Sequence, residues 1–296
     1  MGETKERSPL IFQDVVKVHQ DNGGDDCLSL AFFELANVVH VGYRIAKKHL
    51  KLSNCDLVVS TLQDTSAEGN HTGKIVWETS YLLMDFLLER GVTLGKVLEV
   101  GAGCGMLGQV LAASKYTKKV VLTECDEVMR NVQRNLDRNQ GIFRSKKDQP
   151  RVVARQLDWL DPKRDIAIAS KDLRKHSFDT IVGTDVVYTP SLVEPLLSTL
   201  RLMAHEHTIV YLCLQIRCED SHQLLLRKAS TFNWKVDDIS QELKNMLSCS
   251  WGLDMECKLL QLTTINRTVM NKRSTTSGSK TEELLVDVQQ TKRVKR

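Results

Sequence analysis

The sequence lacks long apolar runs, and its cysteines lack the spacing of a metal site. No apolar run approaches the ~18 residues that span a membrane, and the N-terminus has no apolar signal region. The eight cysteines form no CxxC pair and no Cys/His metal pattern. We therefore expect no membrane association and no metal. Reduced thiols indicate a protein of the cytoplasm, with the nucleus as a further location.

The charge is close to balanced. Lys and Arg number 41 and Asp and Glu 37, so the net charge is +4. Much of this excess lies in residues 267–296, which lack a core pattern and end in Lys292-Arg-Val-Lys-Arg296. We predict a basic, solvated tail there, with a nuclear-localisation or RNA-contact role as the alternative. The composition gives no reason to expect a specific nucleic-acid partner.

Upstream of the main domain, two segments of different character are predicted. Residues 1–26 are polar and end in a cluster of Asn, Gly and Asp, which indicates a flexible N-terminus. Apolar and polar residues then alternate over 39–45 and 57–62, which predicts a hairpin or two short strands. We assign residues 27–74 to this N-terminal β extension.

Residues 75–266 alternate predicted strands with predicted helices. This order predicts an α/β fold with a doubly wound, mostly parallel seven-stranded sheet, in which ligands bind at the carboxyl ends of strands. After the fifth strand, a final hairpin-like pair fits an antiparallel insertion. The predicted strands are 97–100, 119–124, 151–157, 178–183 and 208–216, with two more near 233–239 and 256–264.

A glycine-rich segment links the first of these strands to a helix. Bare backbone amides at a helix N-terminus favour an anionic or nucleotide ligand. Residues 103–108 match the GxGxxG dinucleotide fingerprint, with Glu124 some twenty residues on to hold a ribose. Residues 99–105 instead read acid-x-Gly-x-Gly-x-Gly, which resembles motif I of the seven-β-strand methyltransferases that bind S-adenosylmethionine (SAM). Because Gly101 closes the strand, we favour the second reading.

Two further strand ends carry residues suited to a nucleoside. Glu124 can accept hydrogen bonds from both ribose hydroxyls, although Asp126 and Glu127 are close alternatives. Asp158 and Trp159 follow the third strand, where they could supply an acceptor and a flat apolar face to an adenine ring.

An acid and a phenol, Asp185 and Tyr188, follow the fourth strand three residues apart. The pKa of a lysine amine in water is near 10.4, so its neutral form costs about 4–5 kcal/mol at pH 7. A carboxylate can orient the ammonium but also keeps it charged, whereas Tyr188 and an apolar channel disfavour the charge. We assign Asp185 to positioning, and whether it also accepts the proton stays open.

Together these elements resemble methyltransferase family 16, the lysine methyltransferase-like group, and in particular its type-21 branch. The resemblance covers residues 39–265 and rests on Trp77, the glycine motif, Glu124, Asp158-Trp159, Gly183–Tyr188 and Gln215-Ile-Arg217. It implies a Rossmann-like methyltransferase fold, SAM as cofactor, and Asp185 and Tyr188 facing the substrate. The predicted cofactor-binding residues are Trp77, Glu99, Gly101, Ala102, Gly103, Gly105, Glu124, Asp158, Trp159 and Thr184.

The sequence departs from that family at three single positions and in two long inserts, around 141–150 and 161–177. Glu124 stands where the family usually has Asp, Leu160 where it commonly has Gly, and Thr184 where Ala is frequent. These departures bear on the substrate more than on the cofactor.

The sequence thus predicts a monomeric SAM-dependent methyltransferase acting on a protein side chain, in the first place a lysine ε-amine. The resemblance points to a folded cytosolic protein of the chaperone, ATPase or elongation factor type. Histidine or arginine as the acceptor stays open. The alternatives are an NAD(P)-dependent oxidoreductase built on residues 103–108, and a SAM-binding interaction protein without activity.

Overall fold

The computed structural model describes residues 38–51, 55–64, 72–143, 151–246 and 256–265. The predicted flexible N-terminus and the basic tail lie outside these residues. Within the described ranges, no helix is long and apolar enough to cross a membrane.

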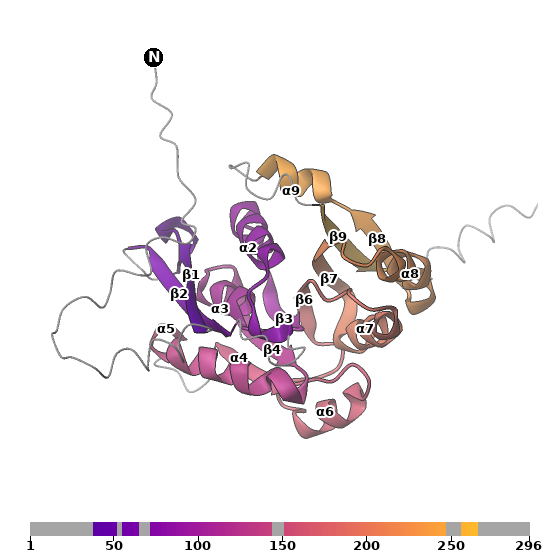
Figure 1. Cartoon of the computed structure of the whole chain (residues 1–296), viewed down its shortest axis with the longest axis horizontal. Helices are drawn as coiled ribbons and strands as arrows, with labels where there is room; N and C mark the ends of the chain where they lie inside the picture. Colours follow the sequence, from indigo (N-terminus) through magenta and orange to yellow (C-terminus); the bar gives the residue numbers. More distant parts are fainter. Residues whose placement is uncertain (1–37, 52–54, 65–71, 144–150, 247–255, 266–296) are drawn as a thin grey trace, which may run out of the picture. The chain divides into compact units, whose positions relative to one another are not determined.

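Seven strands form the central sheet in the order β5-β4-β3-β6-β7-β9-β8 (Figure 1). The pairs β3–β4, β3–β6, β4–β5 and β6–β7 are parallel, whereas β9 runs antiparallel between β7 and β8. The predicted mostly parallel sheet and its antiparallel insertion are therefore confirmed. The strands are β3 (Gly95–Val100), β4 (Thr117–Glu124), β5 (Val152–Gln156), β6 (Phe178–Thr184), β7 (Ala204–Gln215), β8 (Trp234–Asp238) and β9 (Cys257–Thr264).

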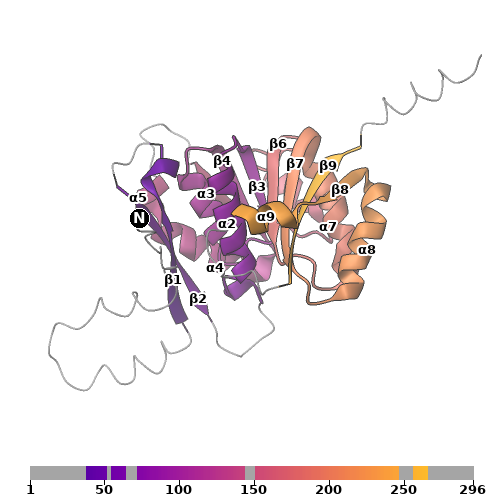
Figure 2. The ribbon, with the colours of Figure 1, turned by 90° about the horizontal axis from the view of Figure 1, so that it is seen from above.

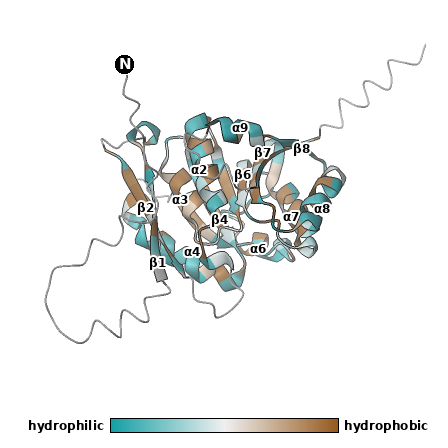
Figure 3. Ribbon diagram, turned by 45° about the horizontal axis from the view of Figure 1, so that its top comes forward, coloured by the Kyte–Doolittle hydropathy of each residue, from teal (hydrophilic) through white to brown (hydrophobic). Residues whose placement is uncertain are grey.

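Helices cover both faces of this sheet, and neighbouring residues of its strands pack in two different hydrophobic clusters. Val97 packs in one hydrophobic cluster with α2, α3 and α4, while Leu98 packs in the other with α7 and α8. Figure 2 shows the sheet between these helices, and Figure 3 shows hydrophilic residues on the outward faces of α8 and α9. The α-helices are α2 (Glu78–Arg90), α3 (Met106–Ala113), α4 (Asp126–Arg138), α5 (Gln140–Phe143), α6 (Pro162–Ile168), α7 (Pro190–Met203), α8 (Glu219–Ala229) and α9 (Ser240–Met246).

The N-terminal hairpin is confirmed as an antiparallel pair, β1 (Val38–Ile45) and β2 (Leu57–Asp64). The second edge of β2 is paired with two amide side chains, Asn135 of α4 and Asn139 at its C-cap. Asn135 accepts from the backbone N–H of Leu62 at 2.8 Å and donates to its carbonyl at 3.0 Å. One helical turn on, Asn139 donates to the carbonyl of Ser60 at 2.8 Å. These bonds attach the hairpin to the main domain.

Three helices, the four-residue α5 among them, occupy segments in which the sequence predicts no helix. The polar insert 161–177 contains α6, which begins at Pro162 and buries Ile166 and Asp165. A seven-residue helix of this composition has too short an apolar stripe for a reliable periodic signal. Residues 240–246 form α9, which buries Leu243 against the core.

Candidate active site

A cavity of about 340 Å³ opens at the carboxyl ends of the central strands. The chain runs from β3 outward through β4 and β5 and then returns to place β6 on the other side of β3, so the switch point lies between β3 and β6. This is where ligands of doubly wound sheets bind. Of the predicted site residues, ten line the cavity: Trp77, Gly101, Ala102, Gly103, Glu124, Asp158, Trp159, Thr184, Asp185 and Tyr188.

The glycine loop between β3 and α3 needs its glycines at the cavity wall. Gly101 and Gly103 have φ of +62° and +55°, in the left-handed region that disfavours side chains. A Cβ on Gly101 would lie 2.8 Å from Cγ1 of Val186, and one on Gly103 would lie 3.2 Å from the carbonyl oxygen of Gly73. The loop backbone therefore forms the surface that a ligand meets.

Glu99 and Gly105 do not line the cavity but support the loop from beneath. The buried Glu99 carboxylate accepts from the backbone N–H of Gly108, in the first turn of α3, at 2.9 Å. Burial raises the pKa of Glu99 to about 8, although that N–H favours the ionised form. Gly105 is the N-cap of α3. Both residues therefore set the start of the helix.

Gly108 packs inside the protein. A Cβ there would overlap the side chains of Leu122 and Glu99. The third glycine of the 103–108 dinucleotide frame is thus a helix-packing residue and does not face the cavity.

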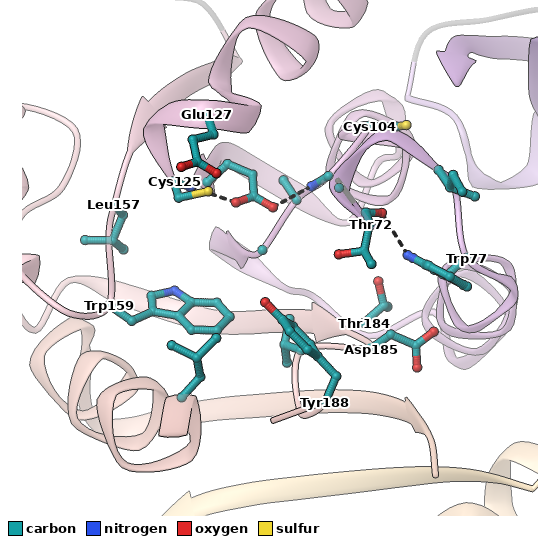
Figure 4. A pocket seen from close by; sticks show the side chains of 18 of the residues that line it. Thr72, Trp77, Cys104, Cys125, Glu127, Leu157, Trp159, Thr184, Asp185 and Tyr188 are labelled. Atoms are coloured by element: carbon teal, nitrogen blue, oxygen red, sulfur yellow. Dashed lines mark hydrogen bonds between the residues drawn. The ribbon is translucent and has the colours of Figure 1, made fainter. Parts of the chain in front are cut away.

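Glu124 ends β4 and turns its carboxylate to the cavity. One oxygen accepts from the N–H of Gly103 at 3.2 Å, and the other from the N–H of Cys125 at 2.7 Å (Figure 4). Burial raises the pKa of Glu124, and these two N–H groups oppose the rise. Each carboxylate oxygen retains a lone pair, so the group can accept two hydroxyl hydrogen bonds. Asp126 and Glu127 also line the cavity.

Trp159 lies at the end of the cavity away from Trp77 (Figure 4), and its neighbour Asp158 also lines the cavity. The Trp159 ring flanks Gly101, since a Cβ on that glycine would lie 3.5 Å from ring atom Cζ2. The Asp158 carboxylate accepts from the backbone N–H of Leu160 at 2.9 Å. A flat ring beside an acceptor suits an adenine base.

Asp185 is held in an unusual backbone conformation by bonds from two other elements. Its φ is +51°, uncommon for a residue with a side chain. One carboxylate oxygen accepts from the backbone N–H of Gln215 at 2.7 Å, and the other from the hydroxyl of Thr79 at 2.8 Å. Burial raises the pKa of Asp185, and these two bonds oppose the rise.

The start of α2 completes the opposite wall of the cavity. Trp77 donates from Nε1 to the carbonyl of Thr72 at 3.1 Å, and Arg217 stacks on its ring with the guanidinium carbon 4.3 Å from the centroid. The hydroxyls of Ser80 and Thr184 lie 3.0 Å apart. Tyr188 is 48% exposed and lies at the mouth of the cavity. Its partial burial raises the pKa of its phenol.

Sequence reasoning missed the contacts that fix Asp185 from a distance, although Gln215 is among the residues that carry the resemblance. Thr79 and Gln215 are 106 and 30 positions away from it. Thr79 lies in the first turn of α2, and nothing in the sequence directs its hydroxyl to the carboxylate of Asp185, which follows β6. Across the described ranges, no group of three or more His, Cys, Asp or Glu could hold a metal ion.

Comparison with known proteins agrees with this geometry. The family model described as lysine methyltransferase matches residues 57–230. The human protein-lysine N-methyltransferase EEF2KMT is 26% identical over 180 residues, which cover 56% of this chain and 53% of that protein. Mouse protein-lysine methyltransferase METTL21E is 28% identical, with 57% of this chain and 66% of that protein covered. Protein N-lysine methyltransferase METTL21A of Xenopus tropicalis is 27% identical, with 51% and 64% covered. The chain therefore spans between half and two thirds of the length of these curated relatives.

Proposed function

The chain belongs to the lysine methyltransferase family, and we propose that it transfers a methyl group from SAM to the ε-amine of a lysine in another protein. One observation carries this proposal. A single cavity combines a glycine loop and Glu124, suited to a nucleoside, with Asp185 and Tyr188, suited to an amine.

The residues present fit SAM. Trp159 offers a flat face for adenine, Glu124 offers acceptors for the ribose hydroxyls, and the loop at Gly101 and Gly103 leaves backbone where a side chain would obstruct. The remaining wall near Thr72 and Trp77 would hold the amino acid end. SAM supplies an electrophilic methyl group on a sulfonium.

Asp185 has two effects on an entering lysine. Its carboxylate is fixed by Gln215 and Thr79, so it offers a rigid anion that orients the ammonium. The same charge stabilises the protonated amine, which cannot attack a methyl group. The half-buried Tyr188 and the apolar side chains of Val186 and Leu192 at the cavity disfavour that charge, and the proton must leave before transfer.

The substrate is proposed at two levels. The names of the relatives support a protein as the partner and lysine as the acceptor. A substrate of the chaperone, ATPase or elongation factor type remains a finer proposal based on the sequence resemblance. Location in the cytoplasm or nucleus and the monomeric state stay predictions.

The test is incubation of the purified protein and tritiated SAM with a cell lysate freed of small molecules. We expect tritium on a small set of proteins, and mass spectrometry of these to find methyllysine. Calorimetry with S-adenosylhomocysteine and with NADH accompanies it. NADH binding without S-adenosylhomocysteine binding would refute the proposal in favour of an oxidoreductase, and S-adenosylhomocysteine binding without transfer would leave a SAM-binding protein.

A further inference from the structure

Arg217 occupies a position behind the cavity wall. It follows β7, its guanidinium stacks on the Trp77 ring at 4.3 Å, and it does not itself line the cavity. Trp77 does line it, so the indole ring separates the cation from a bound ligand. A cation placed in this way acts through its field rather than by contact.

An opposite charge stands beside it. The Glu78 carboxylate, at the first position of α2, lies 4.0 Å from the Arg217 guanidinium, with the two side chains 49% and 43% exposed. Glu78 lies at the start of α2 and Arg217 just after the end of β7, and these two elements supply the donors to Asp185. Glu78 adjoins Thr79, and Arg217 lies two residues after Gln215, so both donors to Asp185 are next to one member of the pair.

Other titratable groups face Asp185 from each element packed against it. Among the described residues, these groups are Glu78, Cys213, Arg217 and Cys257. Burial raises the pKa of the Cys213 and Cys257 thiols, so both are neutral at pH 7. Tyr188, three residues after Asp185, is also neutral, because burial raises its pKa. The charged groups that act on Asp185 are therefore the cation Arg217 and the anion Glu78.

We propose that Arg217 favours the neutral form of the lysine amine that enters beside Asp185, and that Glu78 limits this effect. The inference rests on the proposed function. A positive charge near an amine disfavours its protonation, whereas Asp185 and Glu78 favour it. Arg217 thus offsets the drawback of placing a carboxylate at the acceptor. The charges of Arg217 and Glu78 both act at Asp185. Burial raises the pKa of the Asp185 carboxyl, the charge of Arg217 lowers it, and the charge of Glu78 raises it further.

The test is the pH dependence of the initial rate between pH 6.5 and 9.5, followed as tritium transferred from saturating SAM to a fixed amount of lysate protein. The rate rises with pH as the bound amine loses its proton. Removing a positive charge in Arg217→Met should move the midpoint of this rise upward by roughly half a pH unit, the size expected for a partly exposed pair. Below the midpoint this is about a threefold lower rate, recovered at high pH.

Companion variants separate charge from structure. Arg217→Lys should keep the wild-type midpoint, and Glu78→Gln should move it downward by a similar amount. Arg90→Met is the matched control, because Arg90 also stacks on an aromatic ring, Phe86, and pairs with a carboxylate, Glu242, away from the cavity. It should leave the midpoint unchanged.

Several results would overturn the inference. These are an unchanged or lowered midpoint in Arg217→Met, an equal loss of rate at every pH, or an upward shift in Arg90→Met as well. A wild-type protein that transfers no tritium at any pH would overturn the proposed function and this inference with it. Transfer by the wild type with an unshifted Arg217→Met overturns this inference alone.

Discussion

The sharpest test of the site is Asp185→Asn, because the structure separates the charge of Asp185 from its structural bonds. An asparagine can accept from the Gln215 N–H with its oxygen and donate its amide to the Thr79 hydroxyl, which then acts as acceptor. Asparagine also tolerates the φ of +51° better than most residues. The variant should therefore fold and bind S-adenosylhomocysteine like the wild type.

Transfer, in contrast, should fall. A hydrogen bond to a charged group contributes about 1.5–3 kcal/mol, so losing the anion that orients the ammonium should lower kcat roughly 10- to 150-fold. Asp185→Ala should also lose stability, since two partly buried donors then lack an acceptor, at a cost of up to about 1–3 kcal/mol each. Tritium transfer, calorimetry and thermal unfolding measure the three effects.

Two results would refute this reasoning. If Asp185→Asn transfers methyl groups within about twofold of the wild type, less than the smallest effect given above, the carboxylate does not orient the amine. If it loses S-adenosylhomocysteine binding as fully as transfer, Asp185 serves the cofactor instead.

Four other residues give separate expectations. Gly101→Ala should weaken S-adenosylhomocysteine binding in calorimetry and cost roughly 1–3 kcal/mol of unfolding free energy, because its Cβ would press on Val186 at a positive φ. Glu124→Ala should lower that affinity about tenfold or more, and unchanged binding would contradict its predicted role. Glu99, with a pKa of about 8 when folded, stays protonated in the native state after the unfolded chain has ionised. Wild-type stability in denaturant should therefore fall between about pH 5 and 8, relative to Glu99→Gln. Asn135→Ala removes three bonds, two of them to β2, so amide exchange of the hairpin should quicken while that of β6 does not.

The features that can be predicted from the sequence are those that depend on residues close together in the chain. The hairpin 39–45 and 57–62 and each strand of the sheet follow from local alternation or apolar runs, and the structure has them within a few residues. The glycine loop and the acids at strand ends could be found because parallel strands bring their carboxyl ends to one edge. Ten of the twelve predicted site residues accordingly line one cavity.

Contacts between distant segments could not be predicted. Asn135 pairs with a strand 73 residues earlier, and its signal in the sequence is only a polar residue on a helix. Glu99 begins the glycine motif and is predicted at the cofactor for that reason, but its side chain turns under the loop toward Gly108. Alternation along a strand tells which side chains share a face of the sheet. It does not tell whether that face meets the cavity or the underside of the loop.

The hydrogen bonds that fix Asp185 connect the acceptor carboxylate to the wall of the cavity formed by Trp77. A residue in the left-handed region persists only where its surroundings fix it, and here three bonds do so: the Asp185 N–H donates to the carbonyl of Cys213 at 3.0 Å, and its carboxylate accepts from Thr79 and Gln215. Thr79 belongs to α2, whose N-cap Trp77 lines the cavity. A change in the position of that helix therefore alters both the cofactor wall and the acceptor carboxylate. Loss of the Thr79 hydroxyl should therefore impair transfer, although Thr79 does not line the cavity.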